Sequence, residues 1–529
     1  MEKFTTHTKE QSENVHDKPN FDEDAIRADR IDEEGLTFRY VARHHPSLVW
    51  WSFFYAMAAV GFRGFDAQVN GAMIGVPSFR RDFGYIFEGE PVLPADWQTA
   101  FNTVGAIGQF FGGFICAWSA DRIGRRYALL IGVVVCSGGI IGQILSATRV
   151  AFVISKLILG VGLGFYLTIG PLMTSEITPV VLRGLSTAGV NLGIALGQLL
   201  SNAAVKGFGE RQDRWAYRAP FALQLFFAAF LFVGVWFAPE SPWHLVRKGR
   251  YEDAEKAMRK LWGKQKDTTV KVAAMKQSHL EHAEEDAPSI FQCFRGTNLV
   301  RTGISTGVFA CQHLVGIIFV LGYSSYFFQL AGLNPARSFD LGVGVTACGV
   351  LGNFLSWFTV NRFGRRNNFI LGMGVLTGLL MLIGIMDVVS SDAAKWVQAA
   401  ATVIYAFVYF NTIGALAFVL LGETSTPSLR GHTTALATAT QSVLGIAMNI
   451  AIPYMVNPDQ ADLKGKVGFI FGGLAAIATA VCFFYIPELK NRSFDQINTL
   501  FEHRVPPRRM GTFTPDEIEQ MKSEAQHDV

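Results

Sequence analysis

The sequence predicts an all-α membrane protein, with twelve transmembrane helices in two pseudo-symmetric six-helix bundles and an intracellular helical segment between them. Three observations support this fold class: charged residues are scarce, long apolar stretches recur, and charged motifs occur twice at a nearly constant offset. Of 529 residues, 50% are hydrophobic and only 17% are charged, whereas about 25% are charged in a typical soluble domain. A surface that faces lipid has no water to solvate charges, and this explains the deficit.

Apolar stretches long enough to cross a bilayer are the first element of the prediction. A spanning helix needs about 20 predominantly apolar residues. Phe221–Ala238, Phe369–Met386 and Val467–Ile486 contain no charged residue. With them we count twelve candidate spans, six on each side of a polar stretch, which begin near residues 49, 97, 127, 150, 186, 220, 299, 341, 368, 396, 432 and 467.

These spans divide the chain into five parts. Residues 1–45 are polar, without an apolar core of signal-peptide type, and we expect a cytoplasmic tail there. The first bundle covers 46–238, the second covers 299–487, and 488–529 form a second cytoplasmic tail. The polar stretch 239–298 contains Ala254-Glu-Lys-Ala-Met-Arg-Lys-Leu261, whose amphipathic spacing favours an intracellular helical segment over a flexible linker.

Basic residues in the short loops predict the orientation, because cytoplasmic loops carry an excess of Lys and Arg. Two very short loops that follow even-numbered spans contain Arg122, Arg125 and Arg126, and Arg362, Arg365 and Arg366. This places both termini in the cytoplasm. The loop at 206–218 is also basic and would lie outside, which makes it the weakest point of the orientation.

Three charged motifs recur at almost one offset, which indicates an internal duplication. Asp121-Arg-Ile-Gly-Arg-Arg126 returns as Asn361-Arg-Phe-Gly-Arg-Arg366, and Glu176-Ile-Thr-Pro-Val-Val-Leu-Arg183 returns as Glu423-Thr-Ser-Thr-Pro-Ser-Leu-Arg430. Pro239-Glu240 returns as Pro487-Glu488. The chain therefore consists of two parallel six-helix halves, an arrangement that places a substrate site at mid-membrane between the halves.

These motifs, together with Pro239-Glu-Ser-Pro242, resemble those of the sugar porters of the major facilitator superfamily over roughly residues 45–507. Pro239-Glu-Ser-Pro-Trp-His-Leu-Val-Arg-Lys-Gly-Arg250 and Gly322-Tyr-Ser-Ser-Tyr-Phe-Phe328 are similar to segments of fungal maltose and general α-glucoside permeases. The resemblance implies proton-coupled sugar uptake. Two departures are Ala117, where the family usually has Gly, and Asn361, which replaces a second Asp.

The charged motifs lie at helix ends, where opposite charges can form a network that ties the two halves together on one side. Breaking such a network would let the halves rock and expose one site alternately. The competing interpretation is that the arginines only orient the helices. The candidate gating network consists of Asp121, Arg122, Arg125, Arg126, Glu176, Arg183, Arg362, Arg365, Arg366, Glu423 and Arg430.

Long amides inside the spans are candidates for holding a sugar, which presents hydroxyl rims and apolar faces. Amides rarely face lipid, although an interhelical hydrogen bond explains any one of them about as well as ligand contact does. Asn191 and Gln198 are seven residues apart and share one helical face. The candidate substrate-binding residues are Asn191, Gln198, Gln312, His313, Phe418 and Gln441, with Asn449 on the same span as Gln441.

The family resemblance gives these positions individual roles. Asn191 stands where sugar porters commonly carry a sugar-binding Gln, and Gln441 matches a binding Gln. Gln312 matches the first Gln of the Gln-Gln-x-x-Gly-x-Asn motif, in which His313 replaces the second Gln and Ile318 the Asn. Phe418 occupies the position of a Trp that stacks on hexoses. The hexose signature is thus partly erased, which favours a larger or different ligand over glucose.

Proton coupling requires an acid inside the membrane, and Asp66 is the candidate. Gly64-Phe-Asp66-Ala-Gln-Val-Asn-Gly71 resembles the family segment whose Asp carries the coupled proton, and Lys156 matches the Arg that pairs with that Asp. Arg63 lies three residues before Asp66 and could instead hold it permanently ionised. His313 is a further titratable group, although a structural role is the more common one for a histidine.

The leading hypothesis is therefore a proton-coupled importer of an α-glucoside or related oligosaccharide, acting as a monomer in the plasma membrane. Its partners would be a small polyhydroxylated substrate, protons and the lipid bilayer. The alternatives are an exporter of a hydroxylated secondary metabolite and a non-transporting sugar sensor, for which the tail after Pro507 is short. No nucleophile–base arrangement, metal-ligand spacing or phosphate-binding loop occurs, and a net charge of +3 does not suggest nucleic acid. We expect no enzyme activity, cofactor or metal.

Overall fold

The computed structural model describes residues 38–521 apart from 56–58, 179, 264–267, 285–288, 390, 427–428, 491, 493, 515–516 and 519. The chain forms two compact units. We call the smaller one the linker unit; it comprises Met1–Trp51, Glu176–Gly184 and Pro239–Asp286. The larger one, the transmembrane unit, comprises Ser52–Ser175, Leu185–Ala238 and Ala287–Val529.

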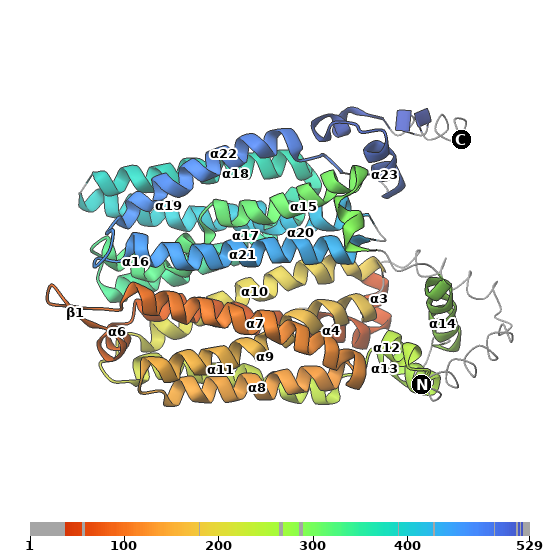
Figure 1. Cartoon of the computed structure of the whole chain (residues 1–529), viewed down its shortest axis with the longest axis horizontal. Helices are drawn as coiled ribbons and strands as arrows, with labels where there is room; N and C mark the ends of the chain where they lie inside the picture. Colours follow the sequence, from red (N-terminus) through yellow and green to blue (C-terminus); the bar gives the residue numbers. More distant parts are fainter. Residues whose placement is uncertain are drawn as a thin grey trace, which may run out of the picture. The chain divides into compact units, whose positions relative to one another are not determined.

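The first half of the transmembrane unit contains six spans and a small hairpin. Its first span combines the end of one helix with the next, and a short helix and two antiparallel strands follow it (Figure 1). The elements are α4 (Pro46–Phe53), α5 (Ala59–Ile74), α6 (Pro77–Phe83), β1 (Tyr85–Phe87), β2 (Glu90–Val92), α7 (Ala95–Ile123), α8 (Arg125–Leu145), α9 (Arg149–Ile177), α10 (Val180–Phe208) and α11 (Trp215–Phe237).

The second half repeats the six spans, and two of them are broken. A π-helical segment divides the seventh span, and Thr412 separates two helices of the tenth. The elements are η2 (Ile290–Phe294), α15 (Gly296–Leu314), η3 (Ile318–Gly322), α16 (Ser324–Leu330), α17 (Pro335–Phe363), α18 (Arg365–Val388), α19 (Asp392–Asn411), α20 (Ile413–Thr424), α21 (Arg430–Val456), η5 (Lys464–Lys466), α22 (Val467–Tyr485), α23 (Phe494–Glu502) and η6 (Pro507–Thr512).

The linker unit is also helical. It contains α3 (Phe38–His44), α12 (Pro242–Arg247), α13 (Tyr251–Trp262) and α14 (Thr268–Glu284). Ser241 begins α12 by accepting a hydrogen bond from the backbone of His244. α13 buries Ala254, Met258 and Leu261 at helical spacing, which is the amphipathic pattern of the sequence.

Nine of the described helices or helix pairs are long and apolar enough to cross a membrane. They are α7, α8, α9, α11, α17, α18, the pair α19–α20, α21 and α22. The other three of the twelve expected segments are α4–α5, α10 and α15–α16, which are interrupted or carry polar residues such as Asp66, Asn191 and Gln312. Interior polar groups also occur in the apolar spans, since α9 carries the buried Lys156.

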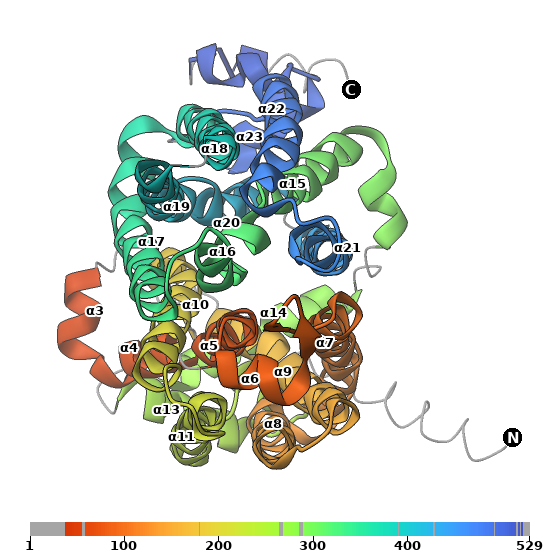
Figure 2. The same cartoon turned by 90° about the vertical axis from the view of Figure 1, so that its left-hand side faces the viewer.

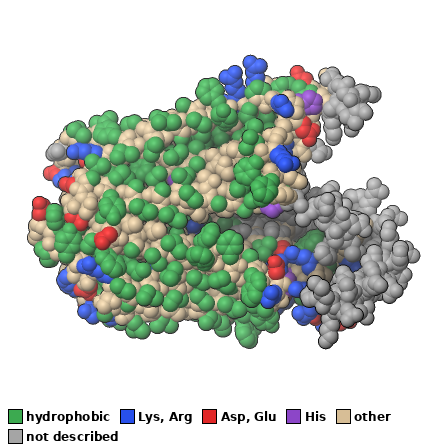
Figure 3. Space-filling view, in the orientation of Figure 1, with side chains coloured by type: hydrophobic (Ala, Val, Ile, Leu, Met, Phe, Trp, Pro, Cys, Tyr) green, Lys and Arg blue, Asp and Glu red, His purple; other side chains and the backbone are tan. Residues whose placement is uncertain are grey.

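Large apolar side chains cover the outer faces of the spans. Phe114, Trp118, Phe226 and Phe358 each expose more than half of their surface. Figure 3 shows hydrophobic side chains along the helices, while Lys, Arg, Asp and Glu gather toward the helix ends. An apolar band bounded by charges is the surface that a bilayer requires.

Close crossings between helices bring the interior residues together. A Cβ at Gly64 of α5 would lie 2.2 Å from the backbone oxygen of Ile194, and one at Gly197 of α10 would lie 2.0 Å from that of Gly61. Small residues at helix crossings let two backbones approach. The crossing of α5 and α10 therefore depends on glycine, and it fixes the face on which Arg63 and Asp66 are presented.

Candidate transport site

A buried ion pair lies inside the first half. Lys156 Nζ of α9 lies 2.8 Å from Asp66 Oδ1 and 3.0 Å from Oδ2 of α5, and both side chains are almost fully buried. Asn70, one turn further along α5, donates to the Asp66 backbone oxygen at 2.7 Å. A single charge in the membrane interior is strongly unfavourable, so each partner makes the other tolerable.

Arg63 stands one turn before Asp66, yet it does not share that pair. Its side chain is half-buried, and its Nε is buried without a hydrogen-bond partner among the described residues. Because both Asp66 oxygens contact Lys156, the geometry gives no support to a permanent Arg63–Asp66 pair. Arg63 is therefore a second cation at this depth, and the Asp66 carboxylate that Lys156 contacts also attracts it electrostatically.

The amides predicted in the second half meet each other. Gln441 Nε2 of α21 donates to Gln312 Oε1 of α15 at 3.0 Å. His313 is buried beside α21, where a Cβ at Gly445 would lie 3.5 Å from its ring. Both ring nitrogens of His313 lack a hydrogen-bond partner among the described residues.

α10 carries two further predicted amides and one that sequence reasoning missed. Asn191 Nδ2 and Gln198 Oε1 are buried without hydrogen-bond partners among the described residues. Asn202 instead reaches the second half, where its Nδ2 donates to the Gly342 backbone oxygen at 2.8 Å. Gln68 of α5 donates to Asn202 Oδ1 and, at 3.0 Å, to the Leu321 backbone oxygen. Helical spacing was the available signal, because Asn202 follows Gln198 by one turn.

Phe418 has an aromatic neighbour of its own. The ring lies on α20 and packs edge-to-face against Phe309 of α15, with the centroids 5.3 Å apart. It is half-buried, so one part of the ring remains open. Phe309 precedes Gln312 by one turn of α15, and an aromatic surface there is compatible with an apolar sugar face.

The charged motif of the first half forms contacts within that half. Asp121 lies 3.3 Å from Arg125, which also donates to the Ala120 backbone oxygen. Arg126 donates to the Val235 backbone oxygen at 3.1 Å, and Arg122 stacks over Trp118. In the linker unit, Glu176 pairs with Arg247 of α12 at 2.8 Å. That partner was not predicted, and the Arg183 side chain lies outside the described residues.

The motif of the second half is more tightly bonded. Arg365 binds both oxygens of Glu423 in a bidentate pair at 2.6–3.2 Å. Glu488 accepts from the backbone nitrogens of Arg365 and Arg366, and so caps α18. Arg366 donates to the Phe483 backbone oxygen, whereas Arg362 is exposed and Arg430 begins α21 half-buried. The ion pairs described here join helices of one half, so a contact between the halves remains a prediction.

We call the end with these arginines the basic end, and the end with the β1–β2 hairpin the hairpin end. At the hairpin end, hydrogen bonds join the halves around Asn457 of the second half. Its Oδ1 accepts from Gln98 of the first half at 2.7 Å, and its Nδ2 donates to the Leu93 backbone oxygen of the first half at 2.8 Å. Tyr326 of the second half also donates to this Oδ1, at 3.2 Å. Figure 2 shows α5 and α7 of the first half beside α16 and α21 of the second.

Further contacts close the same end. Arg80 donates to Gln329 Oε1 at 2.9 Å, and Gln329 Nε2 donates to the Gly75 backbone oxygen. Asn102 donates to the Tyr323 hydroxyl at 2.7 Å. The two halves of the transmembrane unit are therefore held together at the hairpin end.

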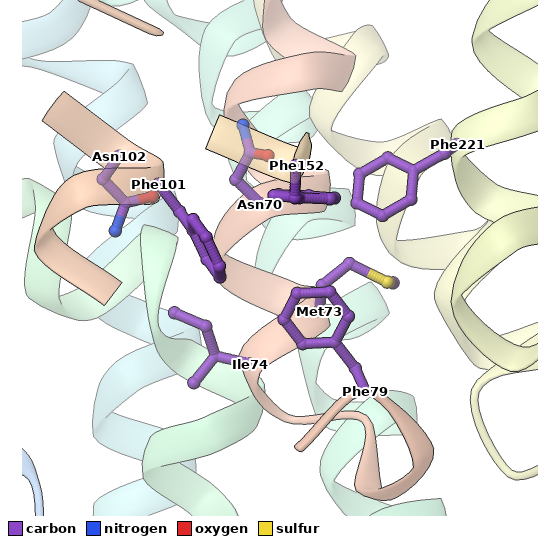
Figure 4. Close-up of a pocket in the computed structure, with 8 residues that line it drawn as sticks. All are labelled: Asn70, Met73, Ile74, Phe79, Phe101, Asn102, Phe152 and Phe221. Atoms are coloured by element: carbon purple, nitrogen blue, oxygen red, sulfur yellow. The ribbon is translucent and has the colours of Figure 1, made fainter. Parts of the chain in front are cut away.

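A small pocket lies inside the first half (Figure 4). Its wall is apolar apart from Asn70 and Asn102, and half of the lining residues are phenylalanines. The lining residues are Asn70, Met73, Ile74, Phe79, Phe101, Asn102, Phe152 and Phe221. None of the predicted substrate-binding residues belongs to this wall, so the cavity is separate from the amide site.

The chain is similar to known transporters over most of its length. The family model described as "Sugar (and other) transporter" matches residues 51–501. A general alpha-glucoside permease of Saccharomyces cerevisiae is 28% identical over 530 residues, covering 98% of this chain and 85% of the permease. A maltose permease of the same species is 27% identical over 517 residues, covering 95% of this chain and 83% of the permease.

Solved structures agree on the fold. The xylose transporter XylE from E. coli in a partially occluded inward-open conformation matches with a TM-score of 0.69 and 21% identity, covering 85% of this chain and all of that one. A structure of the same transporter bound to 6-bromo-6-deoxy-D-glucose matches with a TM-score of 0.67 and 22% identity, covering 86% of this chain and 100% of that one. The predicted twelve-helix major facilitator fold is confirmed. The prediction that the protein is a transporter and not an enzyme is also confirmed. The chain belongs to the sugar transporter family and is homologous to the α-glucoside permeases.

Proposed function

We propose that this transporter couples the uptake of an α-glucoside or a related oligosaccharide to the entry of protons, by alternating access. The observation that carries the proposal is the buried Asp66–Lys156 pair. A carboxylate that is paired in one conformation and separated from its cation in another binds a proton in the second. Arg63 and Cys136 interact electrostatically with this pair, and Tyr166 interacts with Cys136.

The substrate would bind at the amides between the halves. Gln312 and Gln441 offer donors and acceptors to sugar hydroxyls, and Asn191 and Gln198 have atoms without protein partners. Phe418 would supply the surface for an apolar sugar face. His313 adds ring nitrogens that are also without partners. The similarity to permeases named for α-glucosides and maltose supports this substrate class.

The orientation follows from the basic loops. With the basic end in the cytoplasm, the hydrogen-bonded hairpin end would face outward and form the closed outer gate. Both termini would then lie in the cytoplasm of a plasma-membrane protein, with a monomer as the working unit. The charged motifs at the basic end would form the inner gate when the halves approach each other there.

The test is uptake in cells that lack their own sugar carriers. Labelled maltose, with sucrose, trehalose and glucose as competitors, defines the substrate range, and an imposed pH gradient defines the coupling. We expect external acid to drive accumulation in the wild type. Asp66→Asn should retain exchange of labelled for unlabelled sugar but lose accumulation, because no proton is carried.

A matched control removes a carboxylate elsewhere. Asp392 is 95% exposed at the start of α19, so Asp392→Asn should accumulate sugar like the wild type. If Asp66→Asn still concentrates sugar against its gradient, the proposed proton site is wrong. If no α-glucoside competes or accumulates, the proposed substrate class is wrong.

A further inference from the structure

The charges at the centre of the transmembrane unit do not balance within the protein. Asp66 and Lys156 neutralise each other through two short contacts. Asp66 also attracts Arg63, so two cations share one carboxylate, and the buried Nε of Arg63 has no hydrogen-bond partner among the described residues. One carboxylate balances only one of the two cations, so an anion from outside the described chain would balance the second.

The groups around Arg63 fit an anion better than a neutral ring. Arg63 and His313 are close enough to interact electrostatically, across the two halves. α5 contacts α10 at Gly64 and Ile194, so Arg63 and Asn191 lie within one turn of the same crossing. Asn191 Nδ2 is a buried donor without a partner, and the His313 ring nitrogens are also unpartnered. Hydrogen-bond donors and the Arg63 cation thus lie near one another, while both oxygens of Asp66 already contact Lys156.

We infer that the substrate carries a carboxylate, which Arg63 binds, while its sugar hydroxyls bind the amides. The inference rests on the proposed function and names the class within it: an acidic saccharide of the α-glucoside type. A guanidinium binds a carboxylate through two parallel hydrogen bonds, with geometry that a lysine does not reproduce. Gln198 Oε1, an acceptor without a partner, is suited to a hydroxyl of the same ligand.

The experiment compares two open-chain ligands that share one α-glucosyl group. Maltobionate carries a carboxylate where maltitol carries an alcohol, so their affinities differ through that group. Binding of each is measured by calorimetry on the purified full chain. We expect maltobionate to bind at least about tenfold more tightly than maltitol, which corresponds to about 1.4 kcal/mol. Equal affinities in the wild type overturn the inference.

Variants at residue 63 locate the effect. Arg63→Gln keeps a hydrogen-bonding side chain without the charge. Its affinity for maltobionate relative to maltitol should fall to a ratio of about one. Arg63→Lys keeps the charge, and its affinity ratio should lie between those of the wild type and Arg63→Gln. Arg211 is an exposed arginine of the α10–α11 loop, so Arg211→Gln controls for general attraction of anions and should keep the wild-type ratio. A wild-type ratio in Arg63→Gln overturns the inference.

Transport separates this inference from the proposal on which it rests. If vesicles take up maltose and maltitol but show no preference for maltobionate, only the carboxylate is excluded. If they take up none of the three, the α-glucoside substrate class fails as well. If chloride tightens maltitol binding to the level of maltobionate, the counter-charge is an inorganic anion and the inference is overturned. Melting temperatures show whether each variant is folded. If a variant is unfolded, the ratio of maltobionate to maltitol affinity in the wild type still tests the inference.

Discussion

Gly71 offers the sharpest test of how the hairpin end closes. A Cβ at this position of α5 would lie 1.8 Å from the backbone oxygen of Gly322 in the second half. Carbon and oxygen atoms normally stay about 3.3 Å or more apart, so Gly71→Ala forces the two backbones about 1.5 Å apart. Gly322 ends the π-helical segment η3, and a backbone atom cannot rotate away as a side chain can.

The cost falls on one conformation only. Overpacking of this kind typically costs about 1–3 kcal/mol, and the contact exists only while the halves meet at the hairpin end. Taking about 2 kcal/mol, the equilibrium between closed and open hairpin ends should move about 30-fold toward open. The variant should fold, because the rest of each half is unchanged.

Thiol labelling measures the open fraction. Ser325 of α16 is buried at the hairpin end, where it contacts Gly342. In a Ser325→Cys background, a membrane-impermeant maleimide added outside the cell should react about 10–30 times faster when Gly71→Ala is present. The parent chain without Ser325→Cys gives the background from native cysteines. Gly374→Ala is the control, because a Cβ there meets no atom within 4 Å.

An unchanged labelling rate in folded, surface-expressed Gly71→Ala would refute the reasoning. It would mean either that the halves do not separate at this contact or that the backbones yield without cost. A slower rate would contradict it more strongly, since the added methyl group would then favour closure.

Three more predictions concern polar contacts. Asn457→Ala removes the two hydrogen bonds that join Asn457 to Gln98 and Leu93 of the first half, and at about 1 kcal/mol each it should raise the same labelling rate at least tenfold. Arg365→Gln leaves the partly buried Glu423 without its bidentate partner. The free energy of unfolding should fall by about 2 kcal/mol, and the melting temperature of the purified chain by several degrees. An unchanged melting temperature would show that this pair contributes no more than a surface contact. A double-mutant cycle of Gln312→Ala and Gln441→Ala should give a coupling near 0.6 kcal/mol in maltose binding, whereas strict additivity would show that their hydrogen bond does not position the ligand.

The sequence predicted the spans better than it predicted their partners. Apolar stretches and the duplicated motifs identify the twelve segments, because hydrocarbon imposes one strong requirement on length and composition. The proximity of Asp66 and Lys156 followed from family resemblance, since 90 positions separate them and no local pattern links them. Arg365 and Glu423 were placed in one network for the same reason, although the bidentate geometry was not predicted.

The hairpin end was missed because its residues carry no pattern. Gln98, Tyr326 and Asn457 stand singly near helix ends, where polar residues are ordinary. Their significance comes from contacts over more than 100 positions, and these depend on how the halves meet. Hydrogen bonding between distant segments is a property of the packed chain, so composition and spacing do not reveal it.

The unpartnered groups also suggest why an empty carrier should not cycle freely. A state closed at both ends excludes water from Arg63, His313 and Asn191, which have unpaired atoms among the described residues. Each buried polar group without a partner costs about 1–3 kcal/mol, and an uncompensated charge costs more. A bound acidic saccharide would provide partners for these groups at once and lower the energy of the closed state. The same unpaired atoms that identify the site would therefore couple movement of the halves to the presence of substrate, because a ligand shifts an equilibrium by its preference for one state.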